Sequence, residues 1–189
     1  MSTQRKAIAG LMTSITCILG PLSIAVPFSP VPISLGLFGI LLTSVLLGAK
    51  TGTLCAGIYL LLGMAGLPVF SGFTGGIGTL LGPTGGYLLG YLAVAGCSDV
   101  FRAIHAHNPS STPTYNKSAY FLSAAGFVCG LILCYLFGSL WLAHLLQISL
   151  GKALLIGALP YIPADIFKII LALWLGFILR KRLTKASLL

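Results

Sequence analysis

The chain has 189 residues, of which 57% are hydrophobic and only 7% are charged, and its formal net charge is +9. Soluble domains carry about a quarter charged residues, so this composition excludes an ordinary soluble globule and predicts one integral membrane domain over residues 1–189. The basic residues lie at the ends of apolar runs rather than on a polar face, which favours membrane topology over nucleic-acid binding.

Six apolar segments follow one another along the chain, and each is predicted to be a membrane-spanning helix. Their predicted bounds are 7–26, 33–47, 53–66, 83–100, 119–142 and 163–179. The first segment has the basic start and small residues, Ser23 and Ala25, of a signal peptide. Its apolar run is longer than the usual apolar core of a signal peptide and another span follows it, so we interpret it as a membrane-spanning helix. The sequence therefore predicts an all-α bundle of six transmembrane helices.

The second and third segments form an almost continuous apolar run from Ile33 to Gly66. This run is too long for a single crossing of a hydrocarbon core of about 30 Å. Lys50 interrupts it between two nearby glycines, Gly48 and Gly52. A tight helical hairpin that turns at Lys50 is the simplest interpretation.

Two loops between the predicted helices are candidates for binding a ligand. Residues 27–32, PFSPVP, are stiffened by proline and could form a wall or a lid. Residues 71–86, SGFTGGIGTLLGPTGG, are rich in glycine, which lets backbone N–H groups approach a ligand closely. They lack the spacing of a phosphate-binding P-loop. A flexible connector remains the alternative interpretation of this second stretch.

Metal-binding and catalytic patterns are weak. His105 and His107 lie in a polar loop without a third ligand nearby, which favours a solvated loop. The five cysteines form no C-x-x-C pair and are interpreted as small apolar packing residues. They are Cys17, Cys55, Cys97, Cys129 and Cys134. We therefore predict no metal site and no catalytic site.

The chain contains two acidic residues, Asp99 and Asp165. Asp99 is expected to pair with Arg102 at the surface or to face water. Asp165 falls in the first turn of a helix that begins near Pro163, and Lys168 projects from the same helix face. Charged residues within a span usually face a cavity or a partner. A simple salt bridge that stabilises the helix start remains open beside a role in ligand binding.

The basic residues predict the orientation of the chain. If both termini are cytoplasmic, most of them lie on the cytoplasmic side, as the positive-inside rule requires. These are Arg5, Lys6, Lys50, Arg102, Lys117, Arg180, Lys181, Arg182 and Lys185. The two candidate loops and the start of the last helix then share the exterior side.

Several stretches, in this order, resemble the BioY family, the biotin-binding S components of energy-coupling factor (ECF) transporters. They are PFSPVPISL (27–35), LLGAKTGTL (46–54), YLLLGMAGLPVFSG (59–72), TGGIGTLLGPTGGYLLGY (74–91) and IPADIFKIILA (162–172). The resemblance implies a six-helix S-component fold with both termini in the cytoplasm of a bacterial cell, and biotin capture at the exterior side. Biotin is then the transported ligand, and no cofactor is expected.

The resemblance also implies the residues of the site. Asp165 and Lys168 match the acidic-x-x-Lys motif of the family, although Ala164 replaces the glycine that commonly precedes the aspartate. The segment implied to contact ligand contains Phe73, Thr74, Gly75, Gly76, Thr84, Gly85, Gly86 and Tyr87. Asp165 can accept from the ureido N–H groups of biotin, while Lys168 can donate to the ureido carbonyl or to the carboxylate. Tyr59, Phe70, Phe73 and Tyr87 are candidate apolar walls.

S components dock on a T-type membrane subunit through small residues of the first helix, and ABC-type ATPases supply the energy. The nearest small-residue pairs here are Ala9 with Thr13 and Gly10 with Ser14. A transporter that acts without partners remains an alternative. A membrane-embedded transferase is disfavoured, because one intramembrane carboxylate and a distant His144 supply no catalytic cluster.

Overall fold

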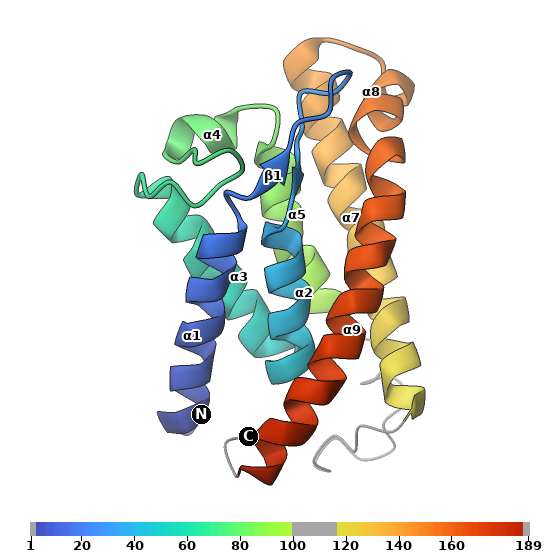
Figure 1. Ribbon diagram of the computed structural model, residues 1–189. Helices are drawn as coiled ribbons and strands as arrows, with labels where there is room; N and C mark the ends of the chain where they lie inside the picture. The colour runs from blue at the N-terminus through green and yellow to red at the C-terminus, as the bar shows by residue number, and fades with distance from the viewer. Residues whose placement is uncertain (1–2, 100–116, 187–189) are drawn as a thin grey trace.

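The computed structural model describes residues 3–99 and 117–186 of the chain. Within them, each of the six predicted apolar segments overlaps a main helix of the bundle in Figure 1. These helices are α1 (Thr3–Leu19), α2 (Gly36–Leu47), α3 (Ala49–Met64), α5 (Gly85–Cys97), α7 (Lys117–Leu146) and α9 (Ile162–Lys185). Arg102 and the polar loop with His105 and His107 lie outside the described residues.

The short elements gather at one end of the bundle. They are β1 (Ser23–Ile24), β2 (Ile33–Ser34), α4 (Ile77–Leu81), α8 (Leu150–Gly157) and the 3₁₀ helix η1 (Leu159–Tyr161). The first turn of α1 and the last turn of α9 lie at the opposite end (Figure 1). We call these the loop end and the termini end.

The first helix is shorter than predicted. The apolar run suggested a helix over 7–26, but α1 stops at Leu19. Pro21 has no N–H and disfavours helical backbone at the preceding residue, Gly20. The chain then turns into β1, which pairs antiparallel with β2 in the register Ser23 to Ser34. Residues 27–32, predicted as a proline-stiffened loop, form the tip of this β-hairpin.

The helical hairpin between α2 and α3 is present, but it turns at Gly48 rather than at Lys50. Gly48 has φ +85°, a conformation that glycine adopts without steric cost. The backbone N–H of Ala49, at the start of α3, donates to Asp99 Oδ2 at 2.7 Å. Asp99 is half-buried in this contact, so it does not simply face water, while its expected pairing with Arg102 involves a residue outside the described part of the chain. Its carboxylate accepts a hydrogen bond from the N–H of Ala49, which has no partner within its own helix.

Helix α2 lies at the centre of the bundle. All of its residues from Gly36 to Leu46 are buried except the half-buried Phe38, as expected for a helix that is apolar on every side. It packs against α1, α3, α5 and α9. At the termini end, Arg180 Nη1 of α9 donates to the carbonyls of Val45 (3.1 Å) and Leu46 (2.7 Å), in the last turn of α2.

Helices α5 and α7 approach each other closely through glycine. A Cβ on Gly90 of α5 would lie 2.8 Å from Cys134 Cα, and a Cβ on Gly130 of α7 would lie 2.6 Å from Val94 Cα. Small residues permit this approach, which stabilises helix pairs in lipid through van der Waals contact.

The outer surface suits a bilayer. Two helical stretches of the described chain, Phe121–Leu146 and Leu150–Lys185, are long and apolar enough to cross a membrane; α2, α3 and α5 are shorter apolar helices. Large apolar side chains are exposed on the outside, among them Ile18, Ile170 and Trp174, each at 60% or more. Extensive exposed apolar surface of this kind marks contact with lipid or protein.

Candidate functional site

A buried ion pair lies near the start of α9. Lys168 Nζ is 2.8 Å from Asp165 Oδ1, and each side chain is only 8% exposed. Helix α9 begins directly after η1, with Pro163 in its first turn, and this start places Asp165 and Lys168 one turn apart on the buried face. Two charges can remain away from water only when they are paired and hydrogen-bonded.

Two further groups complete the hydrogen bonding of this pair. Tyr135 of α7 donates its hydroxyl to Asp165 Oδ2 at 2.7 Å. Lys168 Nζ also donates to the backbone carbonyl of Ser34, in β2, at 2.7 Å. The pair therefore connects α9, α7 and the base of the β-hairpin.

These groups surround a cavity of about 40 Å³. Its lining combines the charged pair with hydroxyls and aliphatic walls contributed by the β-hairpin, α2, α5, α7 and α9. The lining residues are Val31, Pro32, Ile33, Ser34, Leu37, Tyr87, Tyr91, Leu131, Cys134, Tyr135, Gly157, Tyr161, Asp165 and Lys168. Such a cavity, apolar with a few convergent polar groups, has the chemistry of a small-molecule site.

The tip of the β-hairpin is fastened over this cavity. The Tyr161 hydroxyl of η1 is hydrogen-bonded to Ser29 Oγ at 2.6 Å and to the carbonyl of Val31. At the base of the hairpin, Ser34 Oγ donates to the carbonyl of Gly20 at 2.8 Å. The residues predicted as a wall or lid thus form a wall of the cavity that is held at both the tip and the base.

Among the residues of the glycine-rich segment predicted to contact ligand, Tyr87 lines the cavity. Thr74 and Thr84 line a neighbouring hollow of about 350 Å³. Pro32 belongs to the walls of both spaces, so the two lie on either side of the hairpin tip. The structure therefore places part of the segment in the cavity and part beside it.

The remaining residues of that segment do not line the cavity. Phe73 is 67% exposed, and Gly76 donates its N–H to the carbonyl of Gly63 at 2.7 Å. A Cβ on Gly75 or Gly85 would clash with a backbone carbonyl, and one on Gly86 would clash with Trp141 of α7. These contacts, with the bridge between Phe70 and Thr74, make the stretch a folded segment rather than a flexible connector. A ligand contact by these residues stays a prediction.

The aromatic residues predicted as apolar walls do not all line the cavity. Tyr59 and Phe70 pack edge to face, with ring centroids 5.5 Å apart, in a second core cluster that does not line the cavity. The cavity instead uses Tyr91, Tyr135 and Tyr161. Polar side chains within an apolar span indicate a functional site. Tyr91 and Tyr135 are two such residues, and this pattern could have identified them from the sequence.

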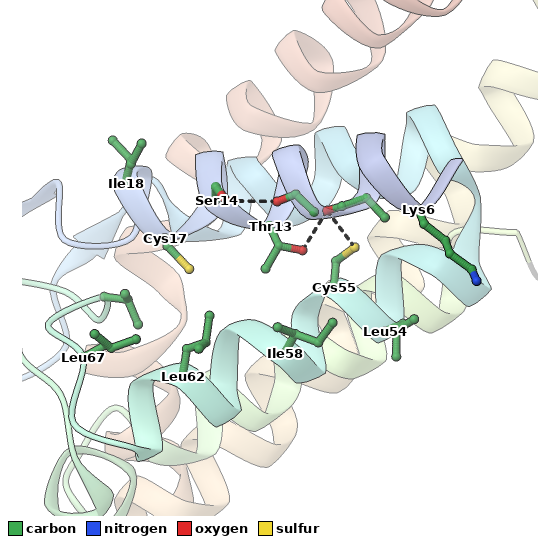
Figure 2. A pocket seen from close by; sticks show the side chains of 13 residues that line it. Lys6, Thr13, Ser14, Cys17, Ile18, Leu54, Cys55, Ile58, Leu62 and Leu67 are labelled. Carbon is green, nitrogen blue, oxygen red and sulfur yellow. Dashed lines mark hydrogen bonds between the residues drawn. The ribbon is translucent and has the colours of Figure 1, made fainter. Parts of the chain in front are cut away.

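The small residues predicted for partner docking line an apolar groove of about 750 Å³ between α1 and α3 (Figure 2). Gly10 and Ser14 are exposed along the groove, whereas Ala9 and Thr13 are buried. The carbonyl of Ala9 accepts from Thr13 Oγ1 at 2.9 Å and from Cys55 Sγ of α3 at 3.6 Å. Two of the four residues therefore face α3, and two remain accessible to a partner.

No group of three or more potential metal ligands is found in the described part of the chain. The four hydrogen-bonding groups around the ion pair are suited to holding a polar ligand head within apolar walls.

Comparison with known proteins identifies the family. A sequence model of the BioY family matches residues 1–185. The "Biotin transporter BioY" of Rhizobium etli is 33% identical over 177 residues, 93% of this chain and 92% of that protein. The protein of the same name from Thermotoga maritima is 33% identical over 173 residues, 92% and 94% of the two chains.

A solved structure gives the same assignment. The crystal structure of the S-component for biotin from an ECF-type ABC transporter superimposes with a TM-score of 0.81 at 31% identity, and the match covers 96% of this chain and 95% of the other. Family model, sequence relatives and fold agree over almost the whole chain. The chain belongs to the BioY family.

Proposed function

We propose that this chain is the biotin-binding S component of an uptake system and that it captures biotin in the cavity at Asp165 and Lys168. Its relatives in Rhizobium etli and Thermotoga maritima are named biotin transporters, and its structural neighbour is an S-component for biotin. The observation that carries the proposal is the buried ion pair, 2.8 Å apart, facing a cavity with aliphatic walls.

The polar groups of the cavity complement the ureido ring of biotin. The ring offers two N–H donors and one carbonyl acceptor. Asp165 accepts and Lys168 donates, while Leu37 and Leu131 supply apolar contact for the thioether ring and the alkyl chain. Lys168 already donates to the carbonyl of Ser34, so a ligand carbonyl joins or replaces that bond.

The size of the cavity requires that the site opens. Pockets for ligands of this kind measure roughly 300–1,000 Å³, whereas the closed cavity holds about 40 Å³. The hydroxyl of Tyr161 joins the β-hairpin tip to η1 across the cavity. We propose that release of the tip from Tyr161 admits the ligand.

The proposed orientation places the termini end in the cytoplasm and the loop end outside, with six crossings of the cell membrane. The basic residues favour this arrangement. The accessible docking residues, Gly10 and Ser14, then face a T-type membrane subunit, and ABC-type ATPases outside this chain energise transport. The structural neighbour, which comes from an ECF-type ABC transporter, supports such partners.

The decisive experiment is titration calorimetry of biotin into purified protein in detergent. We expect Lys168→Ala to weaken affinity by tenfold or more, because loss of a partner in a buried polar site costs about 1–3 kcal/mol. Lys152→Ala is the matched control, since Lys152 is exposed on α8 at the same end of the bundle.

Lys168→Met separates binding from folding, because it keeps most of the aliphatic stem. Thermal unfolding without ligand shows whether each variant is folded. Equal biotin affinities for folded Lys168→Met, Lys152→Ala and the unaltered protein would refute the assignment of the site.

A further inference from the structure

The groove between α1 and α3 has a positively charged group at its termini end, which docking of an apolar partner helix would not require. Both helices begin at the termini end and run in the same direction (Figure 1). On α1, the residues at every fourth position, Lys6, Gly10, Ser14 and Ile18, all line the groove. On α3, Leu54, Ile58 and Leu62 do the same.

The row on α1 starts with a lysine that lines the groove, and a second lysine precedes the row on α3. Lys6 lies at one end of the groove, with its ammonium group pointing away from the apolar lining (Figure 2). Lys50 lies one helical turn before Leu54 on the same face of α3, and it is exposed. Lys6 therefore lies in the lining at the termini end of the groove, and Lys50 lies in the first turn of α3 at the same end of the bundle.

The interior of the groove offers mainly hydrocarbon contact, together with the thiol of Cys17. The hydroxyls of Thr13 and Ser14 both donate to carbonyls of their own helix, at 2.9 and 3.0 Å. The thiol of Cys55 donates to the carbonyl of Ala9. Ile18, Leu54 and Ile58 supply exposed aliphatic surface, and Gly10 leaves room, because a Cβ there would meet nothing within 4 Å.

We propose that this groove binds one anionic phospholipid, with an acyl chain along α1 and α3 and the phosphate between Lys6 and Lys50. Basic sites between membrane helices are suited to anionic headgroups, and each lysine near the surface adds attraction. A partner helix would use the same small residues, so docking there would displace the lipid. When no partner subunit is bound, charge complementarity favours an anionic lipid as the occupant of the groove.

Native mass spectrometry of the full-length protein, released from detergent with added phosphatidylglycerol or phosphatidylcholine of identical acyl chains, tests the proposal. We expect one phosphatidylglycerol to be retained in preference to phosphatidylcholine. Lys6→Ala and Lys50→Ala should each reduce that preference about fivefold. Lys181→Ala, which changes an exposed lysine of α9, is the control and should leave the preference unchanged.

A second pair of variants tests the groove itself. Gly10→Leu should fill it and remove the retained lipid of either headgroup. Gly57→Leu is the control, because Gly57 also has open space at its Cβ but does not line the groove. Biotin titration of the same samples reports whether each variant is folded.

Three results would overturn the proposal. Equal retention of the two lipids by the unaltered protein would exclude headgroup recognition. Equal loss of lipid from Gly10→Leu and Gly57→Leu would place the lipid elsewhere. A dimer peak that Gly10→Leu abolishes, with no retained lipid, would assign the groove to a second copy of the chain.

Discussion

Both carboxylate oxygens of Asp165 are engaged, but by donors from different helices: Lys168 on α9 and Tyr135 on α7. Breaking a buried pair by removing one partner costs about 3–5 kcal/mol, since an uncompensated charge remains. We expect Asp165→Ala to destabilise the protein more than the double variant Asp165→Ala/Lys168→Met. Thermal unfolding in detergent measures this. A double variant less stable than Asp165→Ala would mean that Lys168 is not stranded by loss of the carboxylate.

The hydroxyl of Tyr135 allows a separate test of the site. Tyr135→Phe keeps the ring but removes the hydrogen bond to Asp165, and bonds to charged groups contribute about 1.5–3 kcal/mol. We expect biotin affinity to fall by about tenfold or more. Tyr59→Phe is the matched control, because it removes a hydroxyl bond to the Val69 carbonyl outside the cavity. If both variants bind biotin as the unaltered protein does, Tyr135 has no role in the site.

At the scale of elements, the β-hairpin and η1 are joined across the cavity by one side chain. Tyr161→Phe removes the bonds to Ser29 and Val31 while leaving the buried ring in place. We expect biotin to associate and dissociate faster, because the tip opens more often. Stopped-flow kinetics with a fluorescent biotin derivative measures both rates. Unchanged rates would show that opening occurs at another wall of the cavity.

The helices show how far the sequence predicts this fold. Apolar runs predicted every main helix, because burial and lipid contact both require apolar side chains. The ends were less predictable. The apolar run continues past Leu19, and the charge that interrupts the second run, Lys50, lies two residues after the turn at Gly48. What stops the two helices is backbone chemistry at Pro21 and at Gly48.

The same distinction holds for the site. The contact between Asp165 and Lys168 was predictable, because three residues of helix separate them. Tyr135 and Ser34 are far from the pair in sequence and reach it only through tertiary packing. The positions of Gly75, Gly76 and Phe73 likewise depend on how the loop folds against α3. Spacing alone gave no signal for these contacts.

For the whole molecule, the cavity and the groove mouth lie at opposite ends, which allows binding and docking to be separated. We expect Gly10→Trp to abolish biotin uptake into cells that express the partner subunits while leaving biotin affinity unchanged. Tryptophan blocks close helix approach at an exposed position. Ala9 is a poor choice for this test, because it is only 8% exposed and faces α3.

Gly57→Trp is the control for uptake. If Gly10→Trp transports biotin normally, docking uses another face or the protein acts without partners. If biotin affinity falls as well, α1 supports the cavity, and the two functions are not separable in this way.

The hydrogen bonds between α9 and α2 also give the protein a pair of helices that should not move relative to each other. Lys168 is bonded to the Ser34 carbonyl just before α2, and Arg180 to the Leu46 carbonyl at its end. Twelve residues separate Lys168 from Arg180, about 18 Å of helix at 1.5 Å per residue, and Ser34 lies two residues before the start of α2. Helices α2 and α9 pack against each other, and the Arg180 bonds to the end of α2 oppose sliding of one helix along the other. Spectroscopic labels on α2 and α9 near the Arg180 bonds should therefore keep a constant separation during turnover, giving a fixed reference for recording displacements of the hairpin and α1.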